Sequence, residues 1–557
     1  MSLRVLNINV GVLGHIDSGK TSLSKALSTV SSTASFDKHP QSQERGITLD
    51  LGFSSFSVEI PDHIKVSNNE YDILQFTLVD CPGHASLIRT IIGGAQIIDL
   101  IMLVVDVTKG MQTQTAECLI LGEITCNRLI VVLNKIDLLP VDKKDVLIQK
   151  MSKKILKTLE KTKFANSTVV PVAAKSSAEN TNASVGINTL IDCLKDHAFV
   201  PRRSADGPFV FAVDHCFAIK GQGTVMTGTV IQGSVSISDT VEIPVAKITR
   251  KVKSIQMFKM PVTKAKQGDR VGICVTQFDP KVLERGAICT PGYMETIDKA
   301  ITSVHKIPYF KGKFLSNTKF HISIMHDTVI AKCSFFVHLN KNQNGCAVTD
   351  MFDYDVYYKH VEEITSEYDI AAKQEMKTDE RLMVFALLHF EKPVILCKDS
   401  IYIASKLETD IHANVCRLAF HGKILSVECN KQDNSILSQL KVLKEKTKEG
   451  VVDRMVNEYQ IIVRDLFKKE TNIQIFQNLK VVLSSGEVGI IEGSFGQKGK
   501  VNVRIPDGLF QDTIDSLKTG KKVKQDQNTK ERNDAITVVL KFEKNMYDTK
   551  KKIFQVL

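Results

Sequence analysis

The sequence predicts a multidomain protein with an α/β P-loop domain, two antiparallel β-barrels and a C-terminal β-rich domain. Its 557 residues are too many for a single hydrophobic core. The first 200 residues alternate apolar, strand-like runs with helix-like runs, which is typical of a parallel sheet covered on both faces. After Pro208, short strand-like runs of alternating polarity follow one another across glycine turns, as in antiparallel barrels.

These changes of pattern divide the chain into four expected domains. The predicted boundaries are residues 1–203 for the α/β domain, 204–300 for the first barrel, 301–436 for the second barrel and 437–557 for the C-terminal domain. Within the α/β domain, strands are expected at residues 5–13, 73–80, 100–107 and 129–134, and helices at 20–27, 88–99 and 116–124.

Two stretches in the second half depart from plain barrel patterning. Residues near 340–382 are polar and acidic, and we expect them to form an insertion within the second barrel. The C-terminal domain opens with a charged stretch, residues 441–459, whose charge spacing is helix-like, and strands are expected after it. It ends in basic clusters at 521–524 and 550–552.

Composition narrows the class of protein. The net charge is +11, and residues 441–557 carry 23 basic against 16 acidic side chains, which favours a polyanionic partner. The twelve cysteines include no C-x-x-C pair, which argues against a zinc ribbon or a disulfide framework. The longest apolar stretch, 97–105, is broken by Asp99 and is far shorter than the run of about 20 residues that spans a bilayer. We expect a cytoplasmic protein, with a nuclear pool as an addition.

A phosphate-binding loop is predicted at residues 14–21, which fit G-x-x-x-x-G-K-[ST] between an expected strand and an expected helix. In such a loop backbone N–H groups hold phosphate oxygens, Lys20 reaches the β- and γ-phosphates, and the Thr21 hydroxyl binds Mg²⁺. An incidental glycine turn is the plainer alternative for this pattern alone. The residues expected to contact nucleotide here are His15, Asp17, Ser18, Gly19, Lys20 and Thr21.

Three further motifs at suitable distances argue against that alternative, two for Mg²⁺ and the γ-phosphate and one for the base. Asp80, at the end of an expected strand, is placed to hold Mg²⁺, and the N–H of Gly83 to sense a γ-phosphate. Thr48, in the segment 44–48, is expected to bind Mg²⁺ only when GTP is present, which makes that segment a switch. By itself it reads as an ordinary surface turn.

The base-binding motif is residues 134–137, Asn-Lys-Ile-Asp. Asp137 can accept hydrogen bonds from N1–H and the 2-amino group of guanine, which adenine lacks, so GTP is expected over ATP by roughly 10⁴ to 10⁵. Residues 172–175 follow another expected strand, where a backbone N–H is placed to contact the guanine O6. The base-contacting residues are therefore Asn134, Lys135, Asp137, Ala174 and Lys175.

Together these four motifs resemble the GTP-binding domain of translational GTPases such as elongation factor Tu. The histidine directly after D-C-P-G, His84, separates this family from signalling GTPases. The resemblance implies that His84 positions the water that attacks the γ-phosphate, so His84 is the expected catalytic residue. It extends through both barrels and covers about three-quarters of the chain.

Within that family the chain resembles selenocysteine-specific elongation factors of the eukaryotic type. General factors carry V-E-D-V-F and G-D-N-V-G where residues 213–217 and 268–272 read V-D-H-C-F and G-D-R-V-G. The resemblance implies an aminoacyl pocket of Phe53, Asp214, His215 and Arg270. A selenol is more acidic than a thiol, whose pKa is about 8.5, so Arg270 and a His215 held by Asp214 would favour selenolate over the serine hydroxyl. An Asp214–Arg270 pair that only joins two strands is the structural alternative.

The extension beyond residue 437 is expected to contact the selenocysteine insertion signal, either as RNA or through its binding protein. The best candidate is 464–472, where basic and aromatic residues occur together; the tail from Lys518 is as easily a solvated surface. The expected function is thus a monomeric, GTP-hydrolysing factor that delivers selenocysteinyl-tRNA to the ribosome at recoded UGA codons. Alternatives are a general or initiator-tRNA carrier, and a noncatalytic RNA-binding scaffold with a vestigial GTPase domain.

Overall fold

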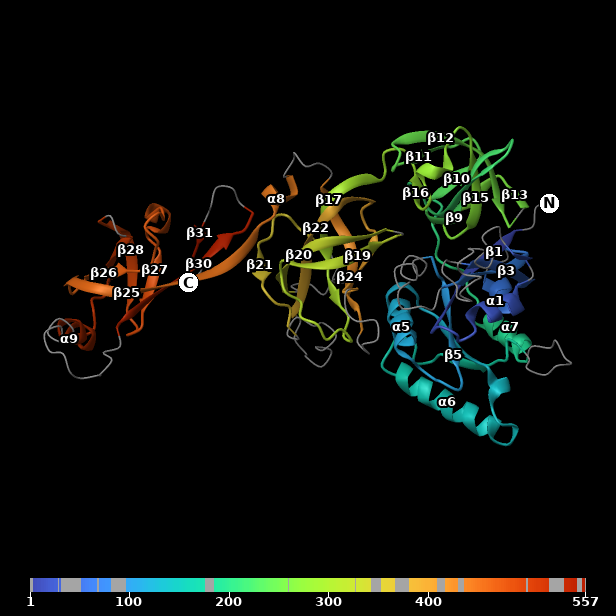
Figure 1. The fold of residues 1–557 in the computed structure, drawn as a ribbon. Helices are drawn as coiled ribbons and strands as arrows, with labels where there is room; N and C mark the ends of the chain where they lie inside the picture. Colours follow the sequence, from blue (N-terminus) through green and yellow to red (C-terminus); the bar gives the residue numbers. More distant parts are fainter. Residues whose placement is uncertain are drawn as a thin grey trace. The chain divides into compact units, whose positions relative to one another are not determined.

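The structure, a computed structural model, describes most of the chain as two compact units. The described residues are 4–28, 30–31, 52–67, 70–81, 97–175, 185–258, 260–325, 327–341, 352–365, 380–407, 416–428, 435–496, 499–519, 535–547 and 553–555. The first unit comprises Met1–Cys333, Thr365–Met376 and Phe385–Gln432; the second comprises Ser334–Ile364, Lys377–Val384 and Asp433–Leu557 (Figure 1).

The N-terminal domain contains a seven-stranded sheet in the order β2-β3-β4-β1-β5-β6-β7. Strands β4, β1, β5, β6 and β7 are parallel, and β3 is antiparallel to β4. The strands are β1 (Val5–Gly14), β2 (Val30–Ser31), β3 (Gly52–Glu59), β4 (Ile73–Asp80), β5 (Leu100–Asp106), β6 (Leu129–Asn134) and β7 (Thr168–Pro171). The four predicted strands are confirmed.

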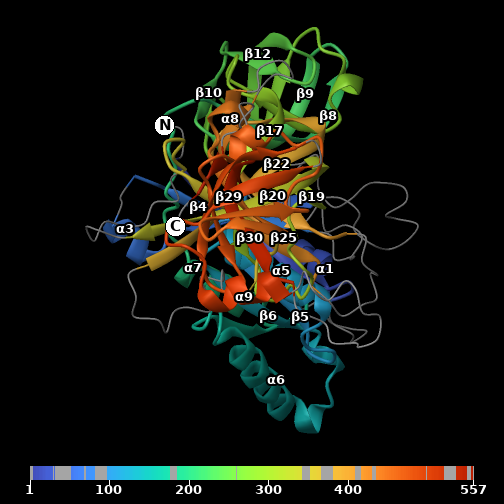
Figure 2. The same ribbon diagram turned by 90° about the vertical axis from the view of Figure 1, so that its left-hand side faces the viewer.

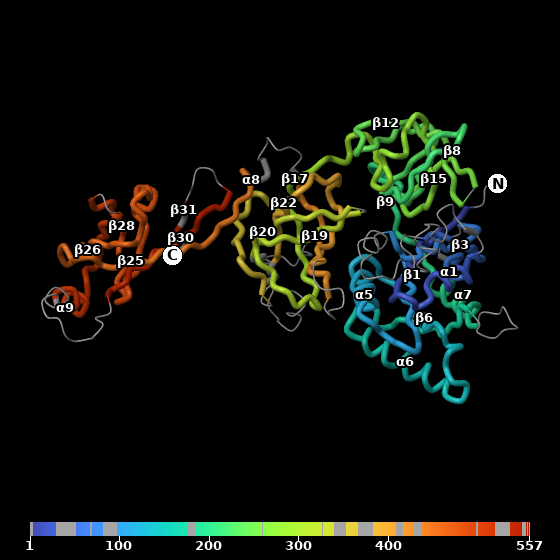
Figure 3. The backbone as a smooth tube through the Cα atoms, in the orientation of Figure 1, coloured from blue at the N-terminus to red at the C-terminus, as the bar shows by residue number. Residues whose placement is uncertain are grey.

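Helices cover both faces of this sheet (Figure 1; Figure 3). Helices α5 (Thr113–Thr125) and α6 (Lys144–Leu159) bury their apolar residues with one face. Helices α1 (Lys20–Leu27), α3 (Asp62–Ser67) and α7 (Ile187–Asp196) pack on the other face. The predictions for 20–27 and 116–124 are confirmed; most of the expected helix at 88–99 lies outside the described residues.

The next domain is a closed six-stranded antiparallel barrel. Its strands follow the order β11-β16-β8-β9-β15-β12, and pairing of β11 with β12 completes the ring. They are β8 (Val210–Ile219), β9 (Gly223–Gln232), β11 (Thr240–Ile243), β12 (Ile248–Met257), β15 (Arg270–Val275) and β16 (Gly286–Cys289); β10 (Ser234–Ser236), β13 (Met260–Val262) and β14 (Lys264–Lys266) are short additions. The predicted first barrel is confirmed.

A second antiparallel barrel follows, closed by pairing of β19 with β20. Its strands are β17 (Glu295–Ser303), β19 (Thr318–Ile324), β20 (Asp327–Lys341), β22 (Glu380–Leu396), β23 (Ile401–Ser405) and β24 (Leu418–Glu428). Of the expected acidic insertion, the structure describes 352–365, which include β21 (Tyr358–Val361) paired with β20 and β25 (Val442–Asn457).

This second barrel contacts the N-terminal domain through apolar and charged groups. Leu418 belongs to the same buried cluster as residues of α5. Next to it, Arg417 donates to Glu117 of α5 from Nε to Oε1 (3.0 Å) and from Nη2 to Oε2 (2.7 Å). Both side chains are at most 7% exposed. A two-pronged bond of this kind fixes direction as well as distance.

The C-terminal strands of the second unit close into a barrel of their own, which faces the viewer in Figure 2. The order is β25-β26-β29-β28-β27-β30, and β30 pairs back with β25. Besides β25, its strands are β26 (Gln460–Arg464), β27 (Lys480–Leu483), β28 (Val488–Phe495), β29 (Lys500–Arg504) and β30 (Thr537–Asn545), with helix α9 (Gln511–Thr519) beside them. The predicted β-rich character is confirmed.

The helix-like reading of residues 441–459 is wrong, because this stretch forms β25. It pairs with β30 continuously from Leu443 opposite Asn545 to Val451 opposite Thr537. Charged residues at helical spacing suggested a helix, but valines at 442, 451, 452 and 456 favour extended backbone. Gly450 also fits a close approach, since a Cβ there would lie 2.8 Å from the carbonyl oxygen of Arg464.

No helix of the described residues is long and apolar enough to cross a membrane. The ten cysteines in the described ranges carry free thiols, eight of them buried.

Candidate functional site

The predicted nucleotide motifs that the structure describes converge at one edge of the parallel sheet. Parallel strands end at the same edge, and the register places Val12 of β1 beside Asp80 and Asp106 of β5 beside Asn134. The glycine loop follows β1 at this edge and leads into α1. Ligands of open α/β sheets bind outside the carboxyl ends of the strands, so this edge is the expected binding site.

The glycine loop leaves no room for side chains at its two ends. Gly19 has φ 92°, and a Cβ there would lie 2.2 Å from Nδ2 of Asn134. A Cβ on Gly14 would lie 2.3 Å from the carbonyl oxygen of Val104. Ser18 is 2% exposed, and within the described part of the chain its buried Oγ has no hydrogen-bond partner. This tight, backbone-lined loop fits a phosphate-binding role.

Lys20 bonds to the backbone of the phosphate loop. Its side chain is buried, and its Nζ donates to the carbonyl oxygens of Gly14 (3.1 Å) and His15 (2.8 Å). Burial lowers the pKa of this ammonium from its ordinary value, although Asp80 acts in the opposite direction. Phosphate oxygens would supply the negative charge that carbonyl oxygens provide only in part, so this geometry favours an anionic ligand.

Thr21 and Asp80 meet at the start of α1. The Thr21 hydroxyl donates to Oδ2 of Asp80 over 2.7 Å, and Asp80 is 2% exposed. These are the hard oxygen groups that divalent cations of the Mg²⁺ type prefer. Three predicted residues of the same site, Thr48, Gly83 and His84, lie outside the described residues.

Asn134 joins the phosphate loop to the predicted base-binding segment. Its Nδ2 donates to the carbonyl oxygen of Ser18 (2.9 Å), and its Oδ1 accepts the backbone N–H of Ala174 (3.1 Å). Asp137 is half-buried in the short turn that follows, whereas Lys175 and Asp17 are exposed. The structure therefore brings three of the predicted segments together through one amide.

Two groups at this edge escaped the sequence reasoning. Asp106 ends β5 and forms an ion pair with Lys135, whose Nζ lies 2.9 Å from Oδ2 of Asp106. This contact fixes Lys135, which has a left-handed φ of 67°. Gln114 of α5 accepts the backbone N–H of Ile16 in the loop (3.3 Å). Asp106 was findable, because it ends its strand as Asp80 does.

Three of the predicted aminoacyl residues meet between the first barrel and β3. Arg270 and Asp214 form a buried pair, with Nη1 2.5 Å from Oδ2 and side chains 5% and 6% exposed. Nη1 also donates to the hydroxyl of Thr229 (3.3 Å). The guanidinium carbon lies 2.9 Å from the centroid of the Phe53 ring, which comes from the N-terminal domain. A cation against an aromatic face is a stabilising contact.

His215, the fourth predicted residue, lies in the first barrel. It follows Asp214 in β8, is half-buried and pairs with Thr227 of β9. Among the described residues Asp214 bonds with Arg270 and not with His215. The structure thus brings Arg270, Asp214 and Phe53 together, while the role of His215 stays a prediction.

Arg270 also lines an open groove on the barrel, with a volume of about 100 Å³. Its walls are mostly apolar and aromatic, from Phe217, Ile219, Val225 and Phe258, with polar groups from Thr227 and Gln256. Apolar walls with a few directed polar groups are typical of ligand sites.

Comparison with known proteins identifies the family. A family model for the elongation factor Tu GTP-binding domain matches residues 6–199, and one for elongation factor Tu domain 2 matches 223–290. The selenocysteine-specific elongation factor of Mus musculus is 50% identical, with each protein covered completely. The chain belongs to the selenocysteine-specific elongation factors.

Further comparisons cover the rest of the chain of this elongation factor. A model for the third domain of eukaryotic selenocysteine-specific elongation factors matches 301–422, and one for the C-terminal RIFT domain of eEFSec matches 438–551. The factor of Methanocaldococcus jannaschii is 31% identical over 90% of this chain and 94% of its own. The predicted family is confirmed.

Solved structures agree with this assignment. The elongation factor SelB of Methanococcus maripaludis, in complex with the GTP analogue GppNHp, is similar with TM-score 0.64 and 26% identity, covering 97% of this chain and 99% of the other. Its apo form gives TM-score 0.63 and 25% identity over the same shares. This elongation factor is therefore a translational GTPase that binds and hydrolyses GTP, and its partners are a tRNA and the ribosome.

Proposed function

We propose that this elongation factor binds selenocysteinyl-tRNA in its GTP form and delivers it to the ribosomal A site at recoded UGA codons. The observation that carries the cargo assignment is the buried guanidinium of Arg270, held between Asp214 and the ring of Phe53. An arginine stays charged and carries five N–H donors in a rigid fork, so one guanidinium can bind Asp214 and a second anion together. The selenolate of the cargo is such an anion, and the serine hydroxyl is not.

The groove beside Arg270 is proposed to hold the end of the tRNA. The amino acid is esterified to the terminal nucleotide, so that nucleotide has to lie next to the amino-acid pocket. The rings of Phe217 and Phe258 offer apolar faces to a base, and Gln256 offers an amide. His215, which is half-buried next to Asp214 in β8, is proposed to contact the same amino acid.

A pull-down from total aminoacyl-tRNA in the presence of a GTP analogue tests the cargo. Enrichment of one serine-family tRNA that bears selenocysteine is expected. Broad enrichment of many aminoacyl-tRNAs would instead indicate a general factor, and enrichment of initiator tRNA would indicate an initiation factor. The same assay with GDP is the control for the nucleotide switch.

For the nucleotide site, we propose that Lys20 binds the β- and γ-phosphates, that Asp137 accepts from guanine, and that Thr21, Asp80 and, in the GTP form, Thr48 hold Mg²⁺. The buried Thr21–Asp80 contact supports this role, because both oxygens face the start of α1 where phosphates would lie. Bound there, Mg²⁺ would offset the negative charge of the β- and γ-phosphates. Gly83 is proposed to contact the γ-phosphate.

His84 is proposed to orient the attacking water. His84→Ala is expected to leave GTP affinity intact, because the side chain acts only on the water, and to slow ribosome-stimulated hydrolysis by about 10²-fold or more. Single-turnover hydrolysis with programmed ribosomes measures the rate. His63→Ala, a change at another histidine of the same domain, is the control; equal rates in the His84 and His63 variants would remove His84 from the mechanism.

The C-terminal barrel is proposed to contact the selenocysteine insertion signal, as RNA or through its binding protein. The pKa of Lys448 is lowered by burial and by two neighbouring cations, Lys446 and Lys468. The three lysines therefore form a basic cluster. Phe467 is 5% exposed and packs on Phe476 with ring centroids 4.5 Å apart. The segment 464–472 thus offers charge to phosphates rather than a ring to bases. We propose that the protein acts as a monomer in the cytoplasm.

A further inference from the structure

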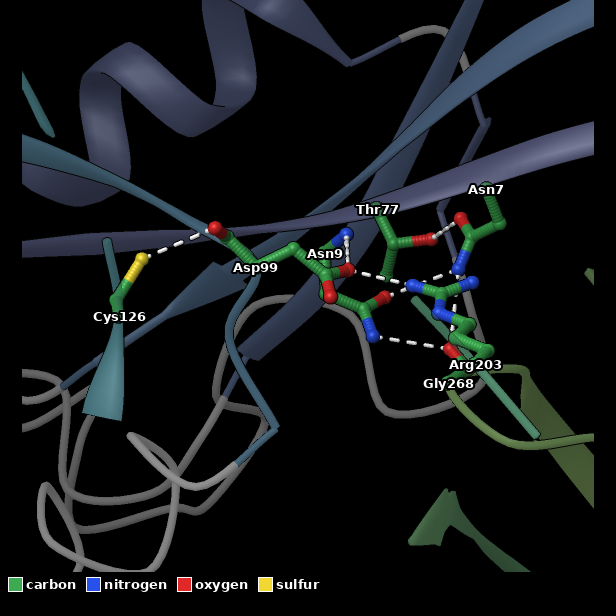
Figure 4. A network of polar contacts seen from close by, with 7 residues as sticks. All are labelled: Asn7, Asn9, Thr77, Asp99, Cys126, Arg203 and Gly268. Atoms are coloured by element: carbon green, nitrogen blue, oxygen red, sulfur yellow. Dashed lines mark hydrogen bonds and ion pairs between the residues drawn. The ribbon is translucent and has the colours of Figure 1, made fainter. Parts of the chain in front are cut away.

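Two asparagines in the central strand of the N-terminal sheet are buried and face the first barrel. Asn7 and Asn9 are two residues apart in β1, so their side chains lie on one face, and they are 4% and 2% exposed. Both donate from Nδ2 to the same carbonyl oxygen, that of Gly268, over 3.2 Å and 2.9 Å (Figure 4). Buried amides are costly unless they are hydrogen-bonded, so this arrangement specifies where Gly268 lies.

The orientation of both amides is fixed by their neighbours. The Thr77 hydroxyl of β4 donates to Oδ1 of Asn7 over 2.6 Å. Nδ2 of Asn7 also donates to Oδ1 of Asn9 over 3.0 Å. With both oxygens occupied as acceptors, both Nδ2 groups point to Gly268, as Figure 4 shows.

Arg203 closes the arrangement from the linker between the two domains. Its Nη2 donates to Oδ2 of Asp99 over 2.5 Å, and the same oxygen accepts the backbone N–H of Asn9 over 2.8 Å. Gly268 has φ 84°, and a Cβ there would lie 2.2 Å from the guanidinium carbon of Arg203. The turn that contains Gly268 is therefore enclosed by the sheet on one side and by Arg203 on the other.

This turn leads directly into the amino-acid pocket. Gly268 stands two residues before Arg270, and its backbone N–H donates to the carbonyl oxygen of Val230 over 2.8 Å. Asp269 braces the turn, because its Oδ2 accepts the N–H of Lys266 over 2.9 Å. A displacement of Gly268 would therefore also displace Arg270.

The N-terminal domain holds both sides of the contact between Arg270 and Phe53. Phe53 lies in β3, which pairs with β4, and β4 pairs with β1 at Thr77 opposite Asn9. The same three strands thus fix the ring under the guanidinium and the amides that hold the start of β15. Groups on rigid, paired strands keep their relative geometry to within a fraction of an ångström.

We infer that Asn7, Asn9 and Arg203 are positioning residues for the amino-acid pocket. They hold the Gly268 turn on the sheet and so set the place of the Arg270 guanidinium against Phe53, without contact with the cargo. This inference rests on the proposed function. Its consequence is that selectivity for selenocysteine depends on a polar contact on the opposite side of the turn from the pocket.

The test is a measurement of selectivity in Asn9→Ala. Affinities for selenocysteinyl-tRNA and seryl-tRNA are measured in the full chain with a GTP analogue, and GTP affinity shows that the domain is folded. Asn9→Ala removes the hydrogen bond to Gly268 and the one from Asn7, and the lost contact with Gly268 is expected to lower the ratio of the two affinities by about fivefold. Asn166→Ala, the same change at an exposed site of the same domain, is the matched control. Arg203→Lys probes the other side of the turn and serves if Asn9→Ala does not fold.

A double-mutant cycle separates positioning from general destabilisation. In a background where Arg270 is already replaced, Asn9→Ala should not change the ratio further, because the two act through one group. A ratio unchanged by both Asn9→Ala and Arg203→Lys, or an equal loss of affinity for both tRNAs, would overturn the inference. Absence of any preference for selenocysteinyl-tRNA in the unaltered chain would instead overturn the proposed function.

Discussion

Asp137→Asn is expected to reduce GTP affinity by roughly 10⁴-fold and to transfer the preference to xanthosine triphosphate. In the proposed site the carboxylate would accept two hydrogen bonds, from guanine N1–H and from the 2-amino group. An amide cannot accept both, but its NH₂ can donate to the 2-oxo group that xanthine carries in that position. Competitive displacement of a fluorescent nucleotide by GTP and by xanthosine triphosphate measures both affinities.

Asp142→Asn is the control for this change. Asp142 is an exposed carboxylate five residues further on, in the short turn Val141–Lys143, so the same loss of charge there should leave GTP affinity unaltered. If Asp137→Asn bound GTP as well as the unaltered protein, the base would have to be recognised by other groups.

Arg270→Asn is expected to remove most of the discrimination between selenocysteinyl- and seryl-tRNA. The lost attraction between guanidinium and selenolate should lower the affinity ratio at least about tenfold, or about 1.4 kcal/mol. The single variant also removes the buried cation that pairs with Asp214, which costs about 3–5 kcal/mol of stability. Equilibrium binding of the two tRNAs, with thermal unfolding measured beside it, separates the two effects.

The double variant Asp214→Asn/Arg270→Asn tells selectivity apart from stability. It removes the buried charge together with its partner, so most of the stability should return while the discrimination stays lost. Retained discrimination in the double variant would mean that the pair is only a structural link between β8 and β15, the alternative that the sequence left open. His215 would then be the remaining candidate for contact with the selenolate.

The parallel sheet and its ligand edge were predictable because their signals are local. Buried parallel strands read as continuous apolar runs, and Asp80 and Asn134 mark where two of them end. The phosphate loop needed no tertiary information either, since Gly19 and Lys20 follow one another in the chain. Asp106 was missed although it ends its strand in the same way. Only its ion pair with Lys135 requires β5 and β6 to be side by side.

The other departures depend on tertiary context. Residues 441–459 carry charges at helical spacing, yet pairing with β30 gives their backbone an extended partner over nine residues. The pairing of Asp214 with Arg270 could be raised from the sequence only as an alternative, because Arg270 in β15 reaches Asp214 in β8 across β9. Likewise, nothing in the sequence marks the carbonyl oxygen of Gly268 as the point where Asn7 and Asn9 meet.

Helix α5 contacts both the phosphate loop and the second barrel. In its first turn, Gln114 accepts a hydrogen bond from the backbone N–H of Ile16 in the phosphate loop. Three residues further on, Glu117 accepts a hydrogen bond from Arg417 of the second barrel. A helix is stiff along its axis, so any shift of the phosphate loop would be transmitted to the barrel over a single helical turn. The phosphate loop and the second barrel are thus connected through one helix, by contacts that do not involve the residues of the amino-acid pocket.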